Sequence, residues 1–352
     1  MSGIKPKLYY SDVHFHNWSA FSTVEDGINT RLLAALQELR RAYEDLRERG
    51  GNVAFCAGDL FHVRGLVATS VLVPVLNFYA ELKELGFVTY CLAGNHDLET
   101  NDTTWAGSLV SALKEVGVHP IDAVKWVEDA CFVPWHASVA DLKAELEKLA
   151  SDDLARHTDL IIHAPVNGVI KGIPDHGLEP EWLAKLGFRR VFAGHYHNHV
   201  EFGGGIYSVG ALTHQTWGDV GSKAGYLIVD DKTVTRVPTQ APRFVDLDQM
   251  TVETDEDLLE AVSGNYVRCS IDNPTQEVMN ERRKELHALG AEGVLIRAIN
   301  TTSVTPTAAR TTKAKLDSLD ESVVNYAEKK GGPDLVEACR DVLNTVRSAK
   351  AA

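Results

Sequence analysis

The sequence lacks the long apolar runs that a membrane protein needs. No stretch of its 352 residues approaches the roughly 20 consecutive apolar residues of a membrane-spanning helix. Residues 1–7 contain no apolar signal region, so we expect a soluble, cytoplasmic protein that does not associate with membranes. The 44% of hydrophobic residues is enough for a substantial core, in two domains or in one large domain with an appendage.

Paired cysteines are also missing. The chain has five cysteines, an odd number, and they are widely separated. Three of them lie inside apolar, strand-like runs. Because this spacing fits neither a disulfide framework nor a zinc site built from cysteines, we expect reduced, buried thiols. The five residues are Cys56, Cys91, Cys131, Cys269 and Cys339.

Positive charge is scarce, since the formal net charge is −14. A protein that held DNA only by neutralising its phosphates should be basic. The acidity argues against unaided, tight DNA binding, but it is compatible with a phosphoester substrate held by metal ions, by a local basic surface or through a partner. The sequence also contains no Gly-x-Ser-x-Gly motif and no P-loop, so nothing indicates a covalent nucleophile.

What the chain does contain is a series of apolar strands that end in side chains able to bind a metal. The first strand ends at Asp12, and His14 follows two residues later. On an extended chain these two side chains point to the same side, about 7 Å apart, so they could share one ion. The second strand ends in Gly58 and Asp59, with His62 three residues further on. Each signal is weak alone, because a single polar residue at a strand end is usually just exposed.

The third strand leads into Gly94, which permits a tight turn, and then into Asn95, His96 and Asp97. An amide, an imidazole and a carboxylate together at the end of a buried strand indicate metal binding or proton transfer more than packing. A fourth apolar strand ends at His163. The repetition of this pattern at several strand ends is stronger evidence for a metal site than any single motif.

The fifth of these strands is followed by Gly194, His195 and His197. A core histidine is usually alone, whereas alternating histidines after a strand and a glycine are much more often ligands. Strands alternate with helices, which predicts a largely parallel sheet, helices outside it, and sites at the carboxyl ends of the strands. Apolar periodicity places the helices at residues 28–49, 70–85, 105–116, 139–149 and about 181–186.

No further cluster of metal-binding side chains occurs between residues 243 and 299. Residues 200–238 show short strands with glycine-rich turns, which predict a second, antiparallel sheet packed on the first. The tail carries an apolar helical stripe. This stripe could dock on the protein itself or bind a partner, and both interpretations stay open.

We divide the chain into a catalytic domain at 1–240, an α+β region at 241–299, a linker at 300–316 and a helical tail at 317–352. Within the α+β region we expect strands at 265–271 and 293–299 and helices at 255–262 and 275–289.

Together the strand ends supply two carboxylates, four imidazoles and an amide. Mixed oxygen and nitrogen ligands suit Mn²⁺, Fe²⁺ or Zn²⁺ better than Ca²⁺ or Mg²⁺, and seven ligands are about right for two ions. Two ions about 3.5–4 Å apart can activate water and stabilise an in-line displacement at phosphorus. The candidate ligands are Asp12, His14, Asp59, Asn95, His163, His195 and His197.

Three residues beside these ligands are candidates for catalysis. Asp97 would fix the tautomer of His96 and raise its pKa, so that His96 could protonate the leaving oxygen; alternatively, Asp97 simply caps the next segment. His62 could reach a substrate phosphate, or it could be a supporting or surface histidine. The spare imidazoles near the motifs, which we do not count as site residues, are His16, His199 and His214.

The five strand-end motifs, taken in the order in which they occur along the chain, resemble those of the calcineurin-like metallophosphoesterase superfamily. The resemblance covers about residues 8–230. The resemblance implies a four-layer αββα sandwich. It also implies two ion sites that share one carboxylate. One ion would be held by Asp12, His14, Asp59 and His197, and the other by Asp59, Asn95, His163 and His195.

A narrower resemblance is to SbcD-type nuclease subunits of bacteria and phages. Residues 58–62 are similar to that subfamily's second motif, residues 243–299 to its DNA-capping domain, and the helical tail to its ATPase-docking segment. The resemblance implies Mn²⁺-dependent exonuclease and endonuclease cleavage of DNA in repair or recombination, gated by an SbcC-like ATPase, and we expect a homodimer. The alternative is a small-molecule phosphodiesterase or phosphomonoesterase, which the acidic charge favours. A non-catalytic scaffold is disfavoured because every ligand position is filled.

Overall fold

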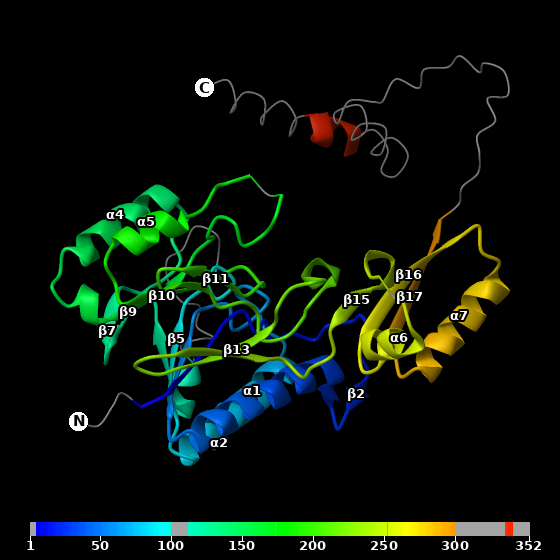
Figure 1. The fold of residues 1–352 in the computed structure, drawn as a ribbon, viewed down its shortest axis with the longest axis horizontal. Helices are drawn as coiled ribbons and strands as arrows, with labels where there is room; N and C mark the ends of the chain where they lie inside the picture. Colours follow the sequence, from blue (N-terminus) through cyan, green and yellow to red (C-terminus); the bar gives the residue numbers. More distant parts are fainter. Residues whose placement is uncertain (1–4, 100–111, 173, 252, 300–334, 341–352) are drawn as a thin grey trace. The chain divides into compact units, whose positions relative to one another are not determined.

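The computed structural model describes residues 5–99, 112–172, 174–251, 253–299 and 335–340 (Figure 1). Residues 1–300 form one compact unit and residues 301–352 a second, in which residues 335–340 are helical. The predicted linker at 300–316, the remainder of the predicted helical tail and residues 105–111 of the helix predicted at 105–116 lie outside the described residues. No helix in the described part of the chain is long and apolar enough to cross a membrane.

Two six-stranded sheets form the catalytic part of the chain. The first has the strand order β14-β13-β1-β4-β5-β6, in which β1, β4, β5 and β6 are parallel. The second has the order β11-β12-β10-β9-β8-β7, in which β8, β9, β10 and β12 are parallel. The first sheet comprises β1 (Lys7–Tyr10), β4 (Val53–Cys56), β5 (Val88–Leu92), β6 (Val118–Ile121), β13 (Gly225–Val229) and β14 (Val234–Pro238). The second comprises β7 (Lys125–Val127), β8 (Ala130–Val133), β9 (Asp159–His163), β10 (Arg190–Gly194), β11 (Val200–Gly203) and β12 (Ile206–Ser208).

The prediction that residues 200–238 form an antiparallel sheet of their own is wrong. These residues do form two hairpins, but β12 pairs in parallel with β10, whereas β13 pairs antiparallel with β1. One hairpin therefore extends each sheet. Glycine-rich turns predict hairpins from local sequence, but the strand edge that a hairpin joins depends on distant partners.

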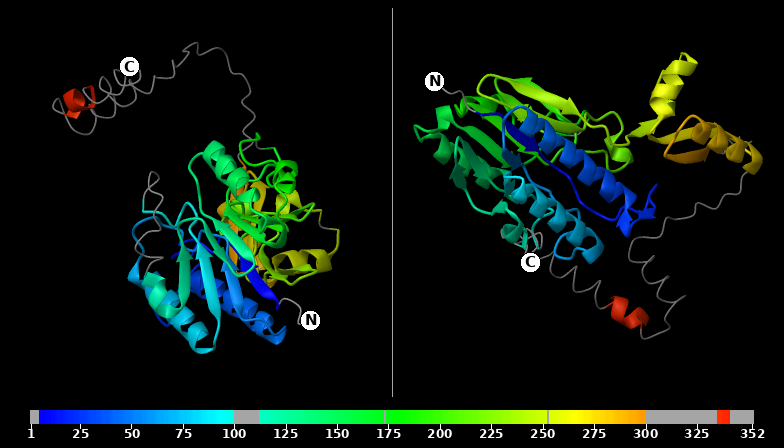
Figure 2. Two further views of the ribbon diagram at one scale, coloured as in Figure 1. Left: turned by 90° about the vertical axis from the view of Figure 1, so that its left-hand side faces the viewer. Right: turned by 90° about the horizontal axis from the view of Figure 1, so that it is seen from below.

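Helices cover both outer faces of the paired sheets (Figure 1). Helices α1 and α2 pack on the first sheet and lie side by side along it (Figure 2), and α4 and α5 pack on the second. Aromatic side chains, including Tyr9, Phe55, Phe132 and Phe192, fill the space between the sheets. The predicted four-layer αββα sandwich is confirmed. The helices are α1 (Thr30–Glu48), α2 (Thr69–Glu84), α4 (Val139–Ala150) and α5 (Pro180–Lys185), with 3₁₀ turns η1 (Leu113–Val116), η2 (Ala155–His157) and η3 (Trp217–Asp219).

Helix α1 illustrates how local sequence sets these elements. The Asn29 side chain accepts hydrogen bonds from the backbone N–H groups of Arg31 and Leu32, so it caps the helix two residues later than periodicity alone predicts. Residues 28–29 instead pair as β3 (Ile28–Asn29) with β2 (Val24–Glu25). The apolar stripe faces the sheet, with Leu39 and Leu46 fully buried.

The cysteines match the predicted buried thiols at four of the five positions. All five are free thiols, and four of them are buried, whereas Cys339 is half-buried. Cys56 and Cys91 occupy facing positions on neighbouring strands β4 and β5. They therefore contribute to the core and not to a disulfide framework.

Residues 241–299 form a small parallel sheet with two helices and an apolar core of their own. The prediction located both helices and the two later strands but missed β15, a short strand that pairs in parallel with β16. The region is joined to the catalytic part where the backbone N–H of Phe244 donates to His214 Nδ1 at 3.1 Å. Its elements are β15 (Phe244–Asp246), η4 (Leu247–Gln249), α6 (Asp255–Val262), β16 (Tyr266–Asp272), α7 (Gln276–Ala288) and β17 (Gly293–Ile299).

Candidate metal centre

The carboxyl ends of strands from both sheets meet at one edge of the sandwich, and the structure brings all seven predicted ligands together there. Asp59 lies at the middle of the group. Its Oδ2 atom is 3.6 Å from His14 Nε2 and 3.4 Å from His163 Nε2. Asp12 Oδ1 lies 3.9 Å from His14 Nε2. Residues as far apart in the sequence as Asp12 and His197 thus surround one small volume.

Asn95 and His195 complete the arrangement on the side of His163. Asn95 Oδ1 lies 3.0 Å from both His163 Nε2 and His195 Nδ1. The backbone N–H of His195 donates to Asp12 Oδ2 at 3.0 Å, which ties the end of β10 to the end of β1. Separations of about 3–4 Å between ligand atoms are those expected around an ion with bonds of about 2.1 Å.

The buried Asp12 carboxylate gives independent evidence that these side chains fit divalent cations. Asp12 is fully buried, and its Oδ1 atom has no hydrogen-bond partner among the described residues. Burial raises the pKa of this carboxyl, because a buried carboxylate without a cation is unfavourable. Two of the groups of side chains close enough to hold an ion share Asp12: Asp12, His14 and His197, and Asp12, Asp59 and His163.

Several of these residues have strained backbones. Asp12, His14 and Asp59 have φ values of 50°, 49° and 54°, and His195 has 100°, all in the left-handed region that side chains disfavour. Hydrogen bonds between strand ends hold this geometry; the N–H of Asp12, for example, donates to the carbonyl of Gly58 at 3.0 Å. Strain of this kind concentrates at functional sites, where surrounding structure enforces it.

The glycines that precede the ligands have a steric role. A Cβ atom on Gly94 would overlap the Asp59 carboxylate, and one on Gly58 would overlap the His163 ring. At Gly194 a Cβ would overlap the Ser11 hydroxyl. Each glycine therefore allows strand ends from different motifs to approach closely, which explains the recurrent glycine–ligand pattern in the sequence.

His163 is held in one orientation. Its Nδ1 donates to the carbonyl of Ala57 at 2.8 Å, so Nε2 faces the other ligands. Burial alone would lower its pKa, but the Asp59 carboxylate outweighs burial and raises the pKa to about 10. Without ions, a protonated His163 thus balances part of the carboxylate charge, and ion binding must displace that proton.

Asp219 was missed by the sequence analysis. Its Oδ1 accepts a hydrogen bond from His197 Nδ1 at 2.7 Å, and its Oδ2 accepts from the backbone N–H groups of Gln215 and Thr216, both at 2.8 Å. The carboxylate therefore fixes the His197 ring with Nε2 free for an ion. The spacing Thr216-x-x-Asp219, a capping box, is a signal that could have drawn attention to it.

We expect Asp219→Asn to weaken ion binding about 10- to 100-fold, the range typical for removing a carboxylate behind a ligating histidine. Competition with a metal-sensitive chelator measures the affinity directly. Asp257→Asn is a matched control, because Asp257 closes the same kind of capping box with Thr254 on α6 and lies outside the centre. Equal ion affinity in the two variants would refute this role for Asp219.

The expected pairing of His96 with Asp97 is not formed. The Asp97 carboxylate instead accepts hydrogen bonds from the backbone N–H groups of Leu60, Phe61 and Gly94. Asp97 thus joins the loop after β4 to the turn after β5 by hydrogen bonds. This role is structural, and it is closer to the capping role that the sequence left open than to catalysis. The group facing His96 Nδ1 is the carbonyl oxygen of His62, at 2.6 Å. Because a carbonyl only accepts, Nδ1 carries a hydrogen and Nε2 is left to accept or pass a proton.

His62 lies at the margin of the centre. Its ring stacks on that of His96 with centroids 5.4 Å apart, and its Nδ1 is 3.4 Å from His14 Nδ1. Burial, and then the neighbouring His16, lower the pKa of His62 to about 4, so it is neutral near pH 7. His62 therefore lies beside the candidate ligand His14 and the candidate acid His96, and its contact with a substrate phosphate stays a prediction.

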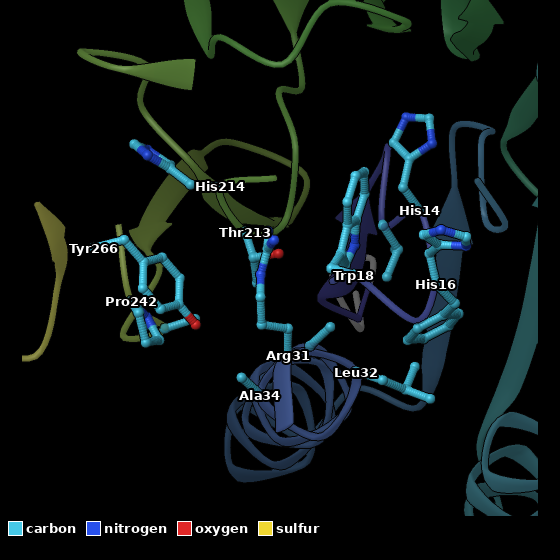
Figure 3. A pocket seen from close by; sticks show the side chains of 14 residues that line it. His14, His16, Trp18, Arg31, Leu32, Ala34, Thr213, His214, Pro242 and Tyr266 are labelled. Carbon is cyan, nitrogen blue, oxygen red and sulfur yellow. The ribbon is translucent and has the colours of Figure 1, made fainter. Parts of the chain in front are cut away.

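A second feature missed from the sequence is Arg31, which connects the edge of the centre to residues 241–299. Figure 3 shows Arg31 rising from α1 between Trp18 and Tyr266. Its guanidinium lies 5.0 Å from the Trp18 ring, 5.1 Å from Phe244 and 5.5 Å from Tyr266. The cavity beside it, which His14 also lines, is about 20 Å³, room for a single water. Arg31 therefore holds residues 241–299 against the catalytic part by cation–π contacts.

Comparison with known proteins identifies the family of this chain. The calcineurin-like phosphoesterase family matches residues 7–199, more than half of the chain, and this span includes all seven candidate ligands. The chain therefore belongs to the calcineurin-like phosphoesterase family of metal-dependent hydrolases. No curated protein matches the sequence.

Two solved structures are similar to this chain. The nuclease MPE of Pseudomonas putida is 15% identical, with a TM-score of 0.30, over 66% of this chain and 87% of that one. A dimetal phosphatase from Danio rerio is 11% identical, with a TM-score of 0.38, over 67% of this chain and 98% of that one. Likeness at this level carries no argument about substrate.

Proposed function

We propose that the protein is a Mn²⁺-dependent nuclease that hydrolyses DNA phosphodiester bonds with water as the nucleophile. The observation that supports this choice is an open cleft of about 1070 Å³ that adjoins the candidate centre and is lined by His195 and His197. Pockets for small molecules are usually about 300–1,000 Å³. The cleft is slightly larger than that range, and its lining extends from the two histidines to Lys171, Lys223 and Arg236, which favours an extended substrate.

The chain's own residues fit hydrolysis without a covalent intermediate. Bound divalent ions would supply Lewis-acid activation of the phosphoryl group and of a water molecule. Asp12 and Asp59 provide the negative charge that holds such ions. His96, fixed through Nδ1, presents Nε2 for proton transfer to the leaving oxygen, and the neutral His62 can donate a hydrogen bond to a phosphate oxygen.

The resemblance to SbcD-type subunits extends this proposal to a partner. It suggests a homodimer that acts in DNA repair or recombination with an SbcC-like ATPase, bound through residues 317–352. Co-purification of the full chain, and of a chain lacking residues 317–352, with an SbcC-like ATPase would test this. Equal recovery of the ATPase with both chains would refute the assigned docking segment.

A small-molecule phosphodiesterase or phosphomonoesterase is the second candidate. The specific observation in its favour is the net charge of −14, which opposes the approach of a polyanion. In this case the enzyme would act on nucleotide-sized esters, and the ligand would fill only part of the cleft.

A comparison of substrates distinguishes the nuclease from the small-molecule phosphoesterase. We expect Mn²⁺ to support degradation of linear and hairpin DNA duplexes, faster than Mg²⁺ does, because the mixed imidazole and carboxylate donors suit Mn²⁺. The measurement is kcat/KM for DNA, bis-p-nitrophenyl phosphate and a nucleotide monoester, with and without the ATPase. Protein that carries two ions and hydrolyses the small esters, yet leaves every DNA intact even with the ATPase, would support the second candidate.

A further inference from the structure

The cleft beside the candidate centre gathers cations that have no carboxylate partner among the described residues. Lys171 follows β9, Lys223 precedes β13, and Arg236 lies on β14; all three line the cleft with His195 and His197. Within the described part of the chain, none of the three forms an ion pair. In a chain with a net charge of −14, unpaired cations gathered in one cleft need an explanation.

The cleft also contains two carboxylates, Asp219 and Glu201. Asp219 is already bound to His197 and to two backbone N–H groups, so it does not neutralise the cations. With Asp219 occupied, three cations and one carboxylate, Glu201, remain in this part of the cleft lining, so it carries an excess of positive charge.

Hydrogen bonds hold the walls of this region in place. Asn198 accepts from the backbone N–H of Lys223 at 2.9 Å and donates to the carbonyl of Val169 at 3.5 Å, which ties three segments of the cleft wall together. Arg236 donates to the carbonyl of Ala224 at 2.9 Å, while its buried Nε has no partner among the described residues. A buried donor without an acceptor is rare in native proteins, and a bound ion is one explanation for it.

Apolar surface lies next to the cations. Ile170 is 39% exposed, and the half-buried Tyr196, whose ring lies 5.0 Å from that of His195, lines the same cleft. Proteins that bind a nucleic acid strand combine cations with aromatic rings, because phosphates pair with the cations and bases or sugars pack on the ring.

We propose that Lys171, Lys223 and Arg236 form an anion subsite that binds a backbone phosphate of the substrate beyond the one being hydrolysed, with Tyr196 and Ile170 packing on the intervening nucleoside. This inference rests on the proposed nuclease function, because a substrate with a single phosphate has nothing to place there. The subsite supplies locally the positive charge that the chain lacks overall.

The test replaces the two exposed lysines together, Lys171→Gln and Lys223→Gln, since Arg236 is half-buried and its loss could disturb β14. The probes are an oligonucleotide and bis-p-nitrophenyl phosphate, both with Mn²⁺. We expect the ratio of kcat/KM for DNA to that for the small diester to fall about tenfold. The slope of log(kcat/KM) for DNA against log[salt] should also become shallower by about 0.7–0.9 for each phosphate that the double variant no longer neutralises. Lys148→Gln, on the outer face of α4, is the matched control.

The possible results distinguish a failure of the proposed anion subsite from a failure of the proposed nuclease function. Wild-type protein that cleaves DNA, together with a double variant that matches Lys148→Gln in both ratio and salt slope, would overturn the subsite alone. Equal loss on both substrates would also overturn it, because the lysines would then support the centre itself. Wild-type protein that hydrolyses the diester but never DNA would overturn the nuclease function and, with it, the subsite.

Discussion

Asp59→Asn is expected to reduce the number of bound ions from two per chain to at most one and to lower kcat/KM for bis-p-nitrophenyl phosphate at least about a thousandfold. Asp59 is 2% exposed, and one of its oxygens lies within 3.6 Å of both His14 and His163. The other accepts the N–H of His96 at 2.8 Å. Asparagine can still accept that hydrogen bond, so the change removes chiefly the charge that two ions would share.

Metal analysis by mass spectrometry and steady-state kinetics measure the two effects on the same preparation. The small diester is the right substrate, because its hydrolysis does not depend on whether DNA is the natural target. Asp257→Asn, on α6, serves as the control for the loss of one carboxylate. An Asp59→Asn protein with two ions and wild-type turnover would show that Asp59 does not join the ion sites, and the centre would need another bridging group.

Local sequence was sufficient for the parts of the centre that depend on one strand and the turn after it. Each of the strands that lead to Asp12, Asp59, Asn95, His163 and His195 is where apolar periodicity places it. Because parallel strands present their carboxyl ends at the same edge, residues at those ends were expected to converge, and the structure brings each of the five within 4 Å of at least one other.

The features that sequence reasoning missed depend on contacts between distant segments. Asp219 supports His197 from 22 positions away in a glycine-rich region with no apolar period. His96 is oriented by a backbone carbonyl, which carries no sequence signature, and the neighbouring Asp97 looked like its partner only because it is adjacent. Arg31 resembled an ordinary charged residue at a helix start, whereas three aromatic rings surround it. Pairing across the sequence is set by packing, which periodicity does not report.

The fold shows the same division. Helix α4 and strand β17 have nearly the predicted bounds, because amphipathic and apolar runs are local properties. β15, only three residues long, is a strand because it pairs with β16, and its own sequence is too short to show a period. The separation of residues 200–238 between two sheets has the same origin.

His96→Asn is expected to lower kcat for DNA about 10²- to 10⁴-fold while both ions remain bound, the range for loss of a general acid. The His96 ring is anchored by donation from Nδ1 to the carbonyl of His62, and its backbone N–H by donation to Asp59. The Asn amide can replace the Nδ1 donor, so the loop keeps its anchor. What the variant lacks is Nε2, the atom that could give a proton to the leaving oxygen.

The leaving group makes this prediction specific. p-Nitrophenolate departs without protonation, whereas the alkoxide released from DNA needs a proton, so His96→Asn should impair DNA cleavage far more than hydrolysis of bis-p-nitrophenyl phosphate. His119→Asn, on β6, controls for the loss of an imidazole elsewhere. Equal impairment on both substrates with both ions present would mean that His96 stabilises charge on the phosphoryl group instead. Loss of an ion would mean that its part is to support the ligands around Asp59.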